Sequence, residues 1–219
     1  MIQHKDQRVG VFVDVQNMYY SARFLYGKHV NFGKVLEEAV SNRRLIRAIA
    51  YVIKTQTGEE NPFFDALGKQ GFEVKMKELQ IFSGGQKKGD WDVGLAIDAI
   101  RMSSKLDVAV IISGDGDYLP LVEYLQNHGV LVEVVAFSGS CSNKLREAND
   151  HFMDLGQDNQ KFLMNYKNRG GTQWMDQDYT ESQNKEESNN KDKFNLSNKL
   201  LPKKRRIVIP FLNDRHKKS

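Results

Sequence analysis

The segment 107–118, DVAVIISGDGDY, joins a strongly apolar run to two closely spaced carboxylates. Its first part, 107–113, is mostly aliphatic and β-branched, which is typical of a strand buried on both faces of a parallel sheet. The glycines that follow predict a tight turn, and a helix is expected over 118–127. Asp115 and Asp117 are therefore expected where a buried strand ends and a helix begins.

The same patterns recur outward from this segment in both directions. Further strands are expected over 9–14, 45–53, 72–79, 130–137 and, in a shorter form, 152–155. Further helices are expected over 17–26, 34–41, 62–69, 91–104 and 142–148. Strands that alternate with helices predict an α/β fold, a three-layer sandwich built on a parallel sheet of five to six strands, with right-handed crossovers.

The composition changes near Gln157. Residues 1–156 carry a slight acidic excess and the apolar runs, so they are expected to form one domain. Residues 157–219 are rich in Asn, Gln, Ser, Lys and Glu and are basic, which predicts a disordered tail. Within it, LLPKKRRIVIPFL at 200–212 is compatible with a docking peptide or with an extra strand. Its KKRR run at 203–206 suits either RNA backbone contact or simple solvation.

The remaining composition limits the class of protein. The chain has one cysteine, so disulfides within the chain cannot hold the fold together. No apolar run approaches the roughly 18 residues that a membrane span needs, and the first residues lack the apolar stretch of a signal peptide. We therefore expect a cytoplasmic protein with no membrane partner.

Carboxylates mark three places where a strand ends or a helix begins. Asp14 closes the first strand in FVDVQN, Asp92 opens the fourth helix in KKGDWDVGLAIDA, and Asp115 and Asp117 follow the fourth strand. In the strand order 3-2-1-4-5, these positions meet at the carboxyl edge of the sheet, where parallel α/β folds bind ligands. Carboxylates packed this closely favour a hard divalent cation such as Mg²⁺ or Mn²⁺, which activates water and polarises phosphoryl oxygens.

Four segments, in order, resemble the NYN domain family and its LabA-like branch: FVDVQNMYYSAR, KGDWDVGLAIDA, SGDGDYLPLVEYLQNHG and LREANDHFMDL. The resemblance covers roughly residues 9–155. It implies a PIN-like fold and metal-dependent ribonuclease action on RNA, with single-stranded RNA favoured. It also implies Mg²⁺ or Mn²⁺ as cofactor, and the sequence leaves a homodimer open. By this resemblance, the acidic metal-binding and catalytic positions are Asp14, Asp92, Asp115 and Asp117, and Asn17 is their polar companion.

Several neighbouring residues have both a functional and a structural interpretation. Lys87 and Lys88 in the glycine-rich loop, and the hydroxyl of Ser113, are candidate RNA contacts; a solvated loop and a simple strand end are the alternatives. Trp91 is expected to pack under the loop rather than to stack on a base. Asp98 lies about 600° of helical rotation from Asp92 and is expected to be a support or surface residue rather than a metal ligand. The aspartates themselves are also suited to capping helices.

Other enzyme classes fit less well. A haloacid-dehalogenase phosphatase needs a second Asp two residues after the first, where this chain has Gln16 after Asp14. The first strand is not followed by a glycine-rich phosphate loop, and there is no Walker A sequence. The main alternative is a non-catalytic RNA-binding or adaptor protein on the same fold. Clustered charge is costly for such a scaffold, which favours the enzyme.

Overall fold

The computed structural model describes residues 4–54, 58–81, 87–88 and 90–165. Along these residues the elements follow one another as β1 (Arg8–Asp14), α1 (Val15–Tyr26), β2 (His29–Val30), α2 (Phe32–Val40), β3 (Arg44–Lys54), α3 (Asn61–Lys69), β4 (Glu73–Glu78), β5 (Gln80–Ile81), β6 (Lys87–Lys88), α4 (Asp92–Met102), η1 (Ser103–Lys105), β7 (Val108–Ile112), η2 (Gly116–Tyr118), α5 (Leu119–Asn127), β8 (Leu131–Ala136), η3 (Ser138–Ser140), α6 (Asn143–Ala148), β9 (His151–Asp154), η4 (Leu155–Asp158), α7 (Asn159–Phe162) and β10 (Leu163–Met164).

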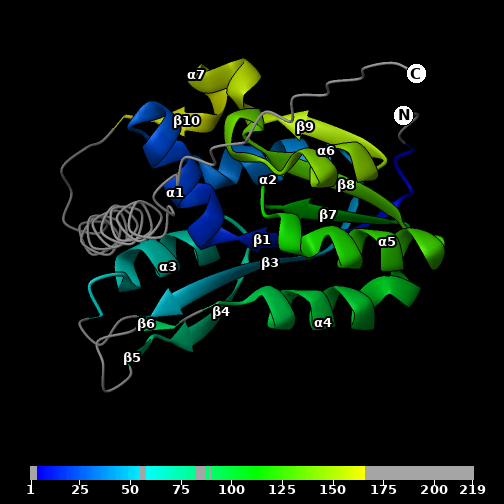
Figure 1. Ribbon diagram of the computed structural model, residues 1–219, viewed down its shortest axis with the longest axis horizontal. Coiled ribbons are helices and arrows are strands. Elements are labelled where there is room, and N and C mark those ends of the chain that lie inside the picture. The colour runs from blue at the N-terminus through cyan, green and yellow to red at the C-terminus, as the bar shows by residue number, and fades with distance from the viewer. Residues whose placement is uncertain (1–3, 55–57, 82–86, 89, 166–219) are drawn as a thin grey trace, which may run out of the picture. The chain divides into compact units, whose positions relative to one another are not determined.

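Six strands form one sheet in the order β4-β3-β1-β7-β8-β9, and every pair is parallel. The first of them in sequence, β1, lies in the middle between β3 and β7 (Figure 1). This confirms the α/β class and the predicted strand order. Because all six strands run the same way, their carboxyl ends share one edge of the sheet.

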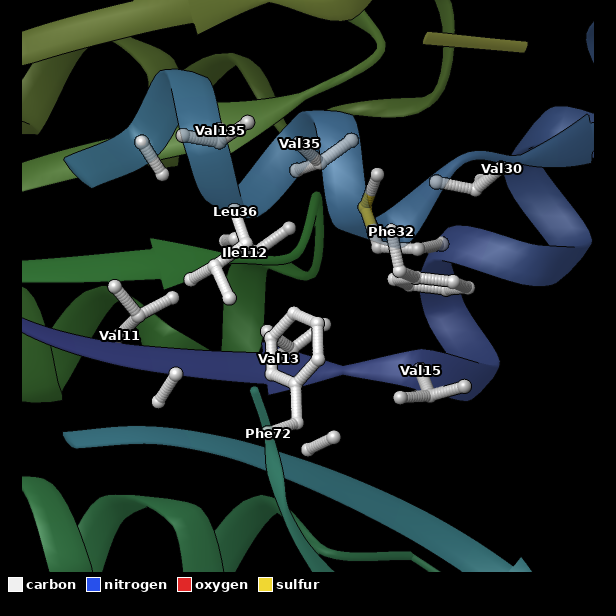
Figure 2. Close-up of a cluster of buried hydrophobic side chains, with 14 of the residues drawn as sticks. Val11, Val13, Val15, Val30, Phe32, Val35, Leu36, Phe72, Ile112 and Val135 are labelled. Atoms are coloured by element: carbon white, nitrogen blue, oxygen red, sulfur yellow. The ribbon is translucent and has the colours of Figure 1, made fainter. Parts of the chain in front are cut away.

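Helices cover both faces of the sheet. One buried cluster unites α1, α2, α3 and α7 with the sheet, and the other unites α4, α5 and α6 with its opposite face. In Figure 2, Val35 and Leu36 of α2 lie over Val11 and Val13 of β1 and Ile112 of β7. Alternate residues of β1 point to opposite faces: Val11 and Val13 join the first cluster and Phe12 the second. Since both faces are covered, the strand carries no polar side chain between Val9 and Val13.

A buried ion pair crosses the first face. The guanidinium of Arg43 contacts both carboxylate oxygens of Glu133 on β8, at 2.7 and 2.8 Å, and also donates to the carbonyl oxygens of Ala39 and Val40. Both charged side chains are almost wholly buried. The pair thereby joins the end of α2 to the second half of the sheet.

The described elements continue past residue 156, the boundary that the change in composition predicts. η4 and α7 follow β9, and β10 pairs antiparallel with β2. Phe162 and Leu163 are buried in the first cluster, which explains why these polar-flanked residues are folded. The segment 200–212 and the KKRR run lie outside the described residues. In the part of the chain that is described, no helix has the length and apolar character that crossing a bilayer requires.

Candidate functional site

Asp14 stands at the carboxyl end of the central strand and caps the next helix. Its Oδ1 accepts a hydrogen bond of 3.0 Å from the backbone N–H of Asn17, as an N-cap residue does. The neighbouring strand β7 ends one residue before Ser113, and Val13 pairs with Ile112. The turn that follows β7 therefore lies directly beside Asp14.

That turn is fixed by hydrogen bonds from side chains. The Oδ1 of Asn17 accepts from the backbone N–H of Gly114 at 2.9 Å, which ties α1 to the turn. Asp115 Oδ1 accepts from the backbone N–H of Asp117 at 3.0 Å and so caps η2. Ser113 Oγ accepts from the backbone N–H of Asp115 at 3.2 Å. Asp115 and Asp117 are held at the edge of the sheet as a result.

Two glycines let the turn pack closely against residues 140–142. A Cβ on Gly114 would lie 3.1 Å from both Cys141 Cα and the Ser140 carbonyl oxygen, which are backbone atoms that cannot easily move. A Cβ on Gly116 would lie 2.9 Å from Ser142 Oγ. The backbone N–H of Ser142 also donates to the Gly114 carbonyl oxygen at 2.9 Å. The GDGD spacing therefore combines two carboxylates with two positions that have no room for a side chain.

The hydroxyl of Tyr118 connects two aspartates that are far apart in the sequence. It lies 3.0 Å from Asp92 Oδ1 and 3.3 Å from Asp14 Oδ2. A hydroxyl has a single proton and donates to one carboxylate at a time. Burial and the two carboxylates raise the pKa of Tyr118, so the phenol remains protonated. Tyr118 thus positions Asp14 and Asp92 with respect to each other.

The acidic residues share one electrostatic environment. Burial raises the pKa of Asp14 to about 6; the hydrogen bond from Asn17 opposes the rise, while the charges of Asp92 and Asp115 add to it. Burial also raises the pKa of Asp92, with Asp115 and Asp117 among the contributing charges. Like charges thus reinforce the cost of burial at this edge of the sheet.

The donor set suits a hard divalent cation, because it consists of carboxylate oxygens that a positive charge would stabilise in their ionised form. Within residues 4–54, 58–81, 87–88 and 90–165, however, no group of three or more His, Cys, Asp or Glu is arranged as a ready-made ligand set. The Tyr118 hydroxyl stands between two of these acids, Asp14 and Asp92. The chemistry of the residues therefore fits a metal ion, while the carboxylates of Asp14, Asp92 and Asp115 accept hydrogen bonds from protein groups.

The matches with known proteins agree with this fold. The family model described as the NYN domain matches residues 8–156. The chain belongs to the NYN domain family. NYN domains are part of the PIN-like nuclease superfamily, which indicates a nuclease-type function.

Two relatives extend the comparison. The protein called low amplitude and bright protein LabA, from Synechococcus elongatus, is 29% identical over 160 residues, covering 69% of this chain and 85% of its own. A crystal structure of a protein of unknown function from Vibrio parahaemolyticus superimposes with a TM-score of 0.67 at 32% identity, covering 75% of this chain and all of its own. Both matches span most of the relative's length, which places the similarity in the NYN domain as a whole.

The side chains of Trp91 and Asp98 form hydrogen bonds with residues of β3 and β4, not with the acidic residues of the site. The indole Nε1 of Trp91 donates to the Val52 carbonyl oxygen at 2.8 Å and the ring packs against the second buried cluster; most of the loop under which it was expected to pack lies outside the described residues. Asp98 accepts hydrogen bonds from Tyr51 at 2.9 Å and from Lys75 at 2.6 Å. Burial alone would raise the pKa of Asp98, but these donors lower it overall.

The structure describes the side chain of only one of the predicted RNA contacts in this NYN domain, Ser113. Ser113 is not available to RNA, because its side chain is fully buried and its hydroxyl accepts the Asp115 N–H. The backbone of Lys87 and Lys88 forms β6, which pairs with β5, but their side chains lie outside the described part of the structure. The sequence had given Tyr118 no role beyond starting a helix. Its position directly after GDGD is the feature that could have drawn attention to it.

Proposed function

We propose that this NYN domain is a metal-dependent ribonuclease that hydrolyses RNA phosphodiester bonds at the carboxyl edge of its sheet. Asp14, Asp92, Asp115 and Asp117 would hold Mg²⁺ or Mn²⁺. The observation that supports this most strongly is the state of Asp14, a buried carboxylate whose pKa is raised to about 6 beside two further acids. A buried acid surrounded by like charge is stabilised by a bound cation, and such groups concentrate at functional sites.

The bound ion would supply polarisation of a phosphoryl oxygen and activation of water. The chain's own residues would provide the geometry. Asn17 holds the turn of Asp115 and Asp117 against α1 through Gly114. Tyr118 orients the carboxylates of Asp14 and Asp92 and acts as a neutral donor.

The contact with RNA would lie next to the start of α4. Lys77 is exposed there; its Nζ donates to the Asp90 carbonyl oxygen at 2.9 Å and lies 5.8 Å from the centre of the Trp91 ring. A cation close to the acidic edge can pair with a phosphate beside the scissile bond. Lys87 and Lys88 would extend this basic contact. Single-stranded RNA suits the proposal because its backbone reaches an open edge more easily than a rigid duplex does.

A non-catalytic RNA-binding or adaptor role is the second candidate. It is favoured by the fact that Asp14 and Asp115 already act as helix caps and that the described residues contain no ready-made ligand set. In that role the domain would bind RNA without cutting it.

Cleavage of labelled single-stranded RNA by the full chain, with Mn²⁺, Mg²⁺ or EDTA, tests the proposal. Asp14→Asn is the informative variant, because Asn keeps the helix cap and removes the charge. Asp65→Asn, on the exposed surface of α3, is the matched control. Metal-dependent cutting that Asp14→Asn lowers by at least about a hundredfold would support the enzyme, in line with the loss of a principal electrostatic group. RNA binding without cutting in all three proteins would favour the adaptor.

A further inference from the structure

Trp91 joins the start of α4 to the sheet. It is the N-cap residue of the helix and directly precedes Asp92, yet its side chain makes no capping hydrogen bond. The indole Nε1 instead donates to the carbonyl oxygen of Val52 on β3, at 2.8 Å. The backbone carbonyl oxygen of Trp91 accepts from the N–H of Leu95 at 2.7 Å, which is how an N-cap residue begins its helix. The residue that begins α4 is therefore bonded to the sheet through its own side chain.

The indole ring is packed tightly in this place. Its centre lies 5.3 Å from the centre of the Tyr51 ring, and it packs against the second buried cluster. Gly94 leaves room for the ring, because a Cβ at that position would lie 2.5 Å from Cε3 of Trp91. Glycine weakens a helix interior, so the indole occupies space that α4 provides at a cost. Lys77 also donates to this segment, at the Asp90 carbonyl oxygen, but from an exposed and flexible side chain.

The strand that accepts the indole bond also pairs with the strand of Asp14. In the register of β1 and β3, Asp14 lies opposite Tyr51, and Val52 is the next residue of β3. Paired strands lie about 4.8 Å apart. The connection from Asp14 to Asp92 therefore needs only one strand pair, one step along β3 and the hydrogen bond from Trp91. It consists of backbone and a packed indole.

We propose that Trp91 is a positioning residue of the acidic site, which fixes Asp92 relative to Asp14 through the backbone. This inference rests on the proposed function, in which both acids hold a cation. The hydroxyl of Tyr118 links the same acids through their side chains, at 3.0 and 3.3 Å. The indole bond involves neither carboxylate, so it does not compete with a cation for their oxygens. Removal of groups that orient metal ligands commonly lowers metal affinity by about 10- to 100-fold.

Calorimetric titration of the full chain with Mn²⁺ tests this role through two variants. Trp91→Phe keeps an aromatic ring and removes the N–H donor, whereas Gly94→Ala forces the indole out of its place. We expect each variant to raise the dissociation constant for Mn²⁺ at least about tenfold. Gly68→Ala in α3 is the control, because a Cβ there meets no atom within 4 Å. We expect this control to bind Mn²⁺ as the wild type does.

A merely structural role would lower stability and leave the Mn²⁺ affinity of the folded protein unchanged. Circular dichroism before each titration therefore shows that the protein measured is folded. A folded Trp91→Phe protein that binds Mn²⁺ within about twofold of the wild type would overturn the proposal, since it lacks the loss that orienting groups cause.

The ring and the glycine can also be tested together. In a Trp91→Ala background, Gly94→Ala has no indole to displace, so we expect no further loss of Mn²⁺ affinity. Alanine favours a helix more than glycine does, so the same change should make that protein more stable. A further loss as large as in the wild-type background would show that Gly94 acts by another route, and would overturn the proposal.

A double-mutant cycle in EDTA tests the positioning without metal. Chemical denaturation compares Trp91→Phe, Tyr118→Phe and the variant with both changes. Since the indole bond and the hydroxyl both hold Asp92 near Asp14, the double variant should lose less stability than the two single losses added together. Additive losses would overturn the proposal.

Failure of the proposed function has a different signature. If the wild type bound Mn²⁺ with the expected effects of the variants but cut no RNA, the nuclease would be refuted and the role of Trp91 would stand. If the wild type bound no Mn²⁺, the metal site would be refuted, and the cycle in EDTA would decide whether Trp91 positions Asp92.

Discussion

The side-chain oxygen of Asn17 accepts a hydrogen bond of 2.9 Å from the backbone N–H of Gly114, although 97 residues separate the two. The bond fixes the acidic turn against α1. Asn17→Ala leaves this N–H without its acceptor, and we expect a loss of about 1–3 kcal/mol in the free energy of unfolding. We also expect weaker Mn²⁺ binding, since Asp115 and Asp117 lose their fixed position. Chemical denaturation and calorimetric titration measure the two effects.

Asn127→Ala, at an exposed position at the end of α5, is the control for this change. If Asn17→Ala altered stability no more than this control, the bond to Gly114 would not be what holds the turn.

The raised pKa of Asp14 predicts that the free energy of unfolding falls as the pH rises. Its pKa is raised from 3.8 to about 6 in the fold, so the folded state favours the protonated form. The stability this provides is complete below pH 3.8 and is lost as the pH rises through about 6. In EDTA, wild type should therefore lose roughly 2.5 kcal/mol relative to Asp14→Asn between pH 4 and pH 7. Denaturation of both proteins across this range measures the difference, and a difference that stays constant with pH would contradict it.

Tyr118→Phe removes the hydroxyl and keeps the ring. The hydrogen bond from Tyr118 lowers the pKa of Asp14, so its loss should raise that pKa further. Protons compete with metal for the carboxylate. We therefore expect the pH at which Mn²⁺ binding is half complete to move upward by up to about one unit. Calorimetric titrations at several pH values measure this, and Tyr124→Phe is the control. An unchanged or lower midpoint would show that the hydroxyl does not stabilise the ionised acid.

The Arg43–Glu133 pair is the strongest candidate for a polar contribution to stability. Both side chains are almost wholly buried and joined by two hydrogen bonds. Glu133→Ala should cost about 3–5 kcal/mol, because it leaves a buried guanidinium without its counter-charge. The double variant Arg43→Met with Glu133→Leu should recover much of that loss. Denaturation curves test both, and equal losses in the single and double variants would contradict the explanation.

Glu37→Ala supplies the comparison, because the ion pair of Glu37 with Lys34 is exposed to solvent. Its loss should change stability far less than the loss of Glu133.

Local patterns in the sequence were sufficient to predict most strands of the sheet. Strands β1, β3, β7 and β8 are largely apolar runs close to their predicted bounds, whereas β4, at one edge of the sheet, alternates charged and apolar residues. The two-residue strands β2 and β10 were not predicted. They form only because Leu163 pairs with Val30, a contact across more than 130 residues that no local pattern encodes.

The candidate site could also be predicted only in part. The positions of Asp14 and Asp92 at element ends could be predicted from the sequence alone. That Tyr118 joins them could not, because its hydroxyl reaches partners 104 and 26 residues away. For Ser113 the sequence left an RNA contact and a simple strand end open, because a serine at that position looks the same in sequence whether its hydroxyl points outward or accepts a bond inside the turn.

Asp14 is the last residue of β1, a strand that is hydrogen-bonded on both sides and has no exposed residue between Val9 and Val13. Amide protons in such a strand exchange with solvent only when the whole domain opens, whereas those of edge elements exchange through small local openings. The carboxylate of Asp14 is thus attached to the slowest-exchanging part of the molecule. On heating, this end of the site should persist until the fold itself is lost, so inactivation and global unfolding should share one transition.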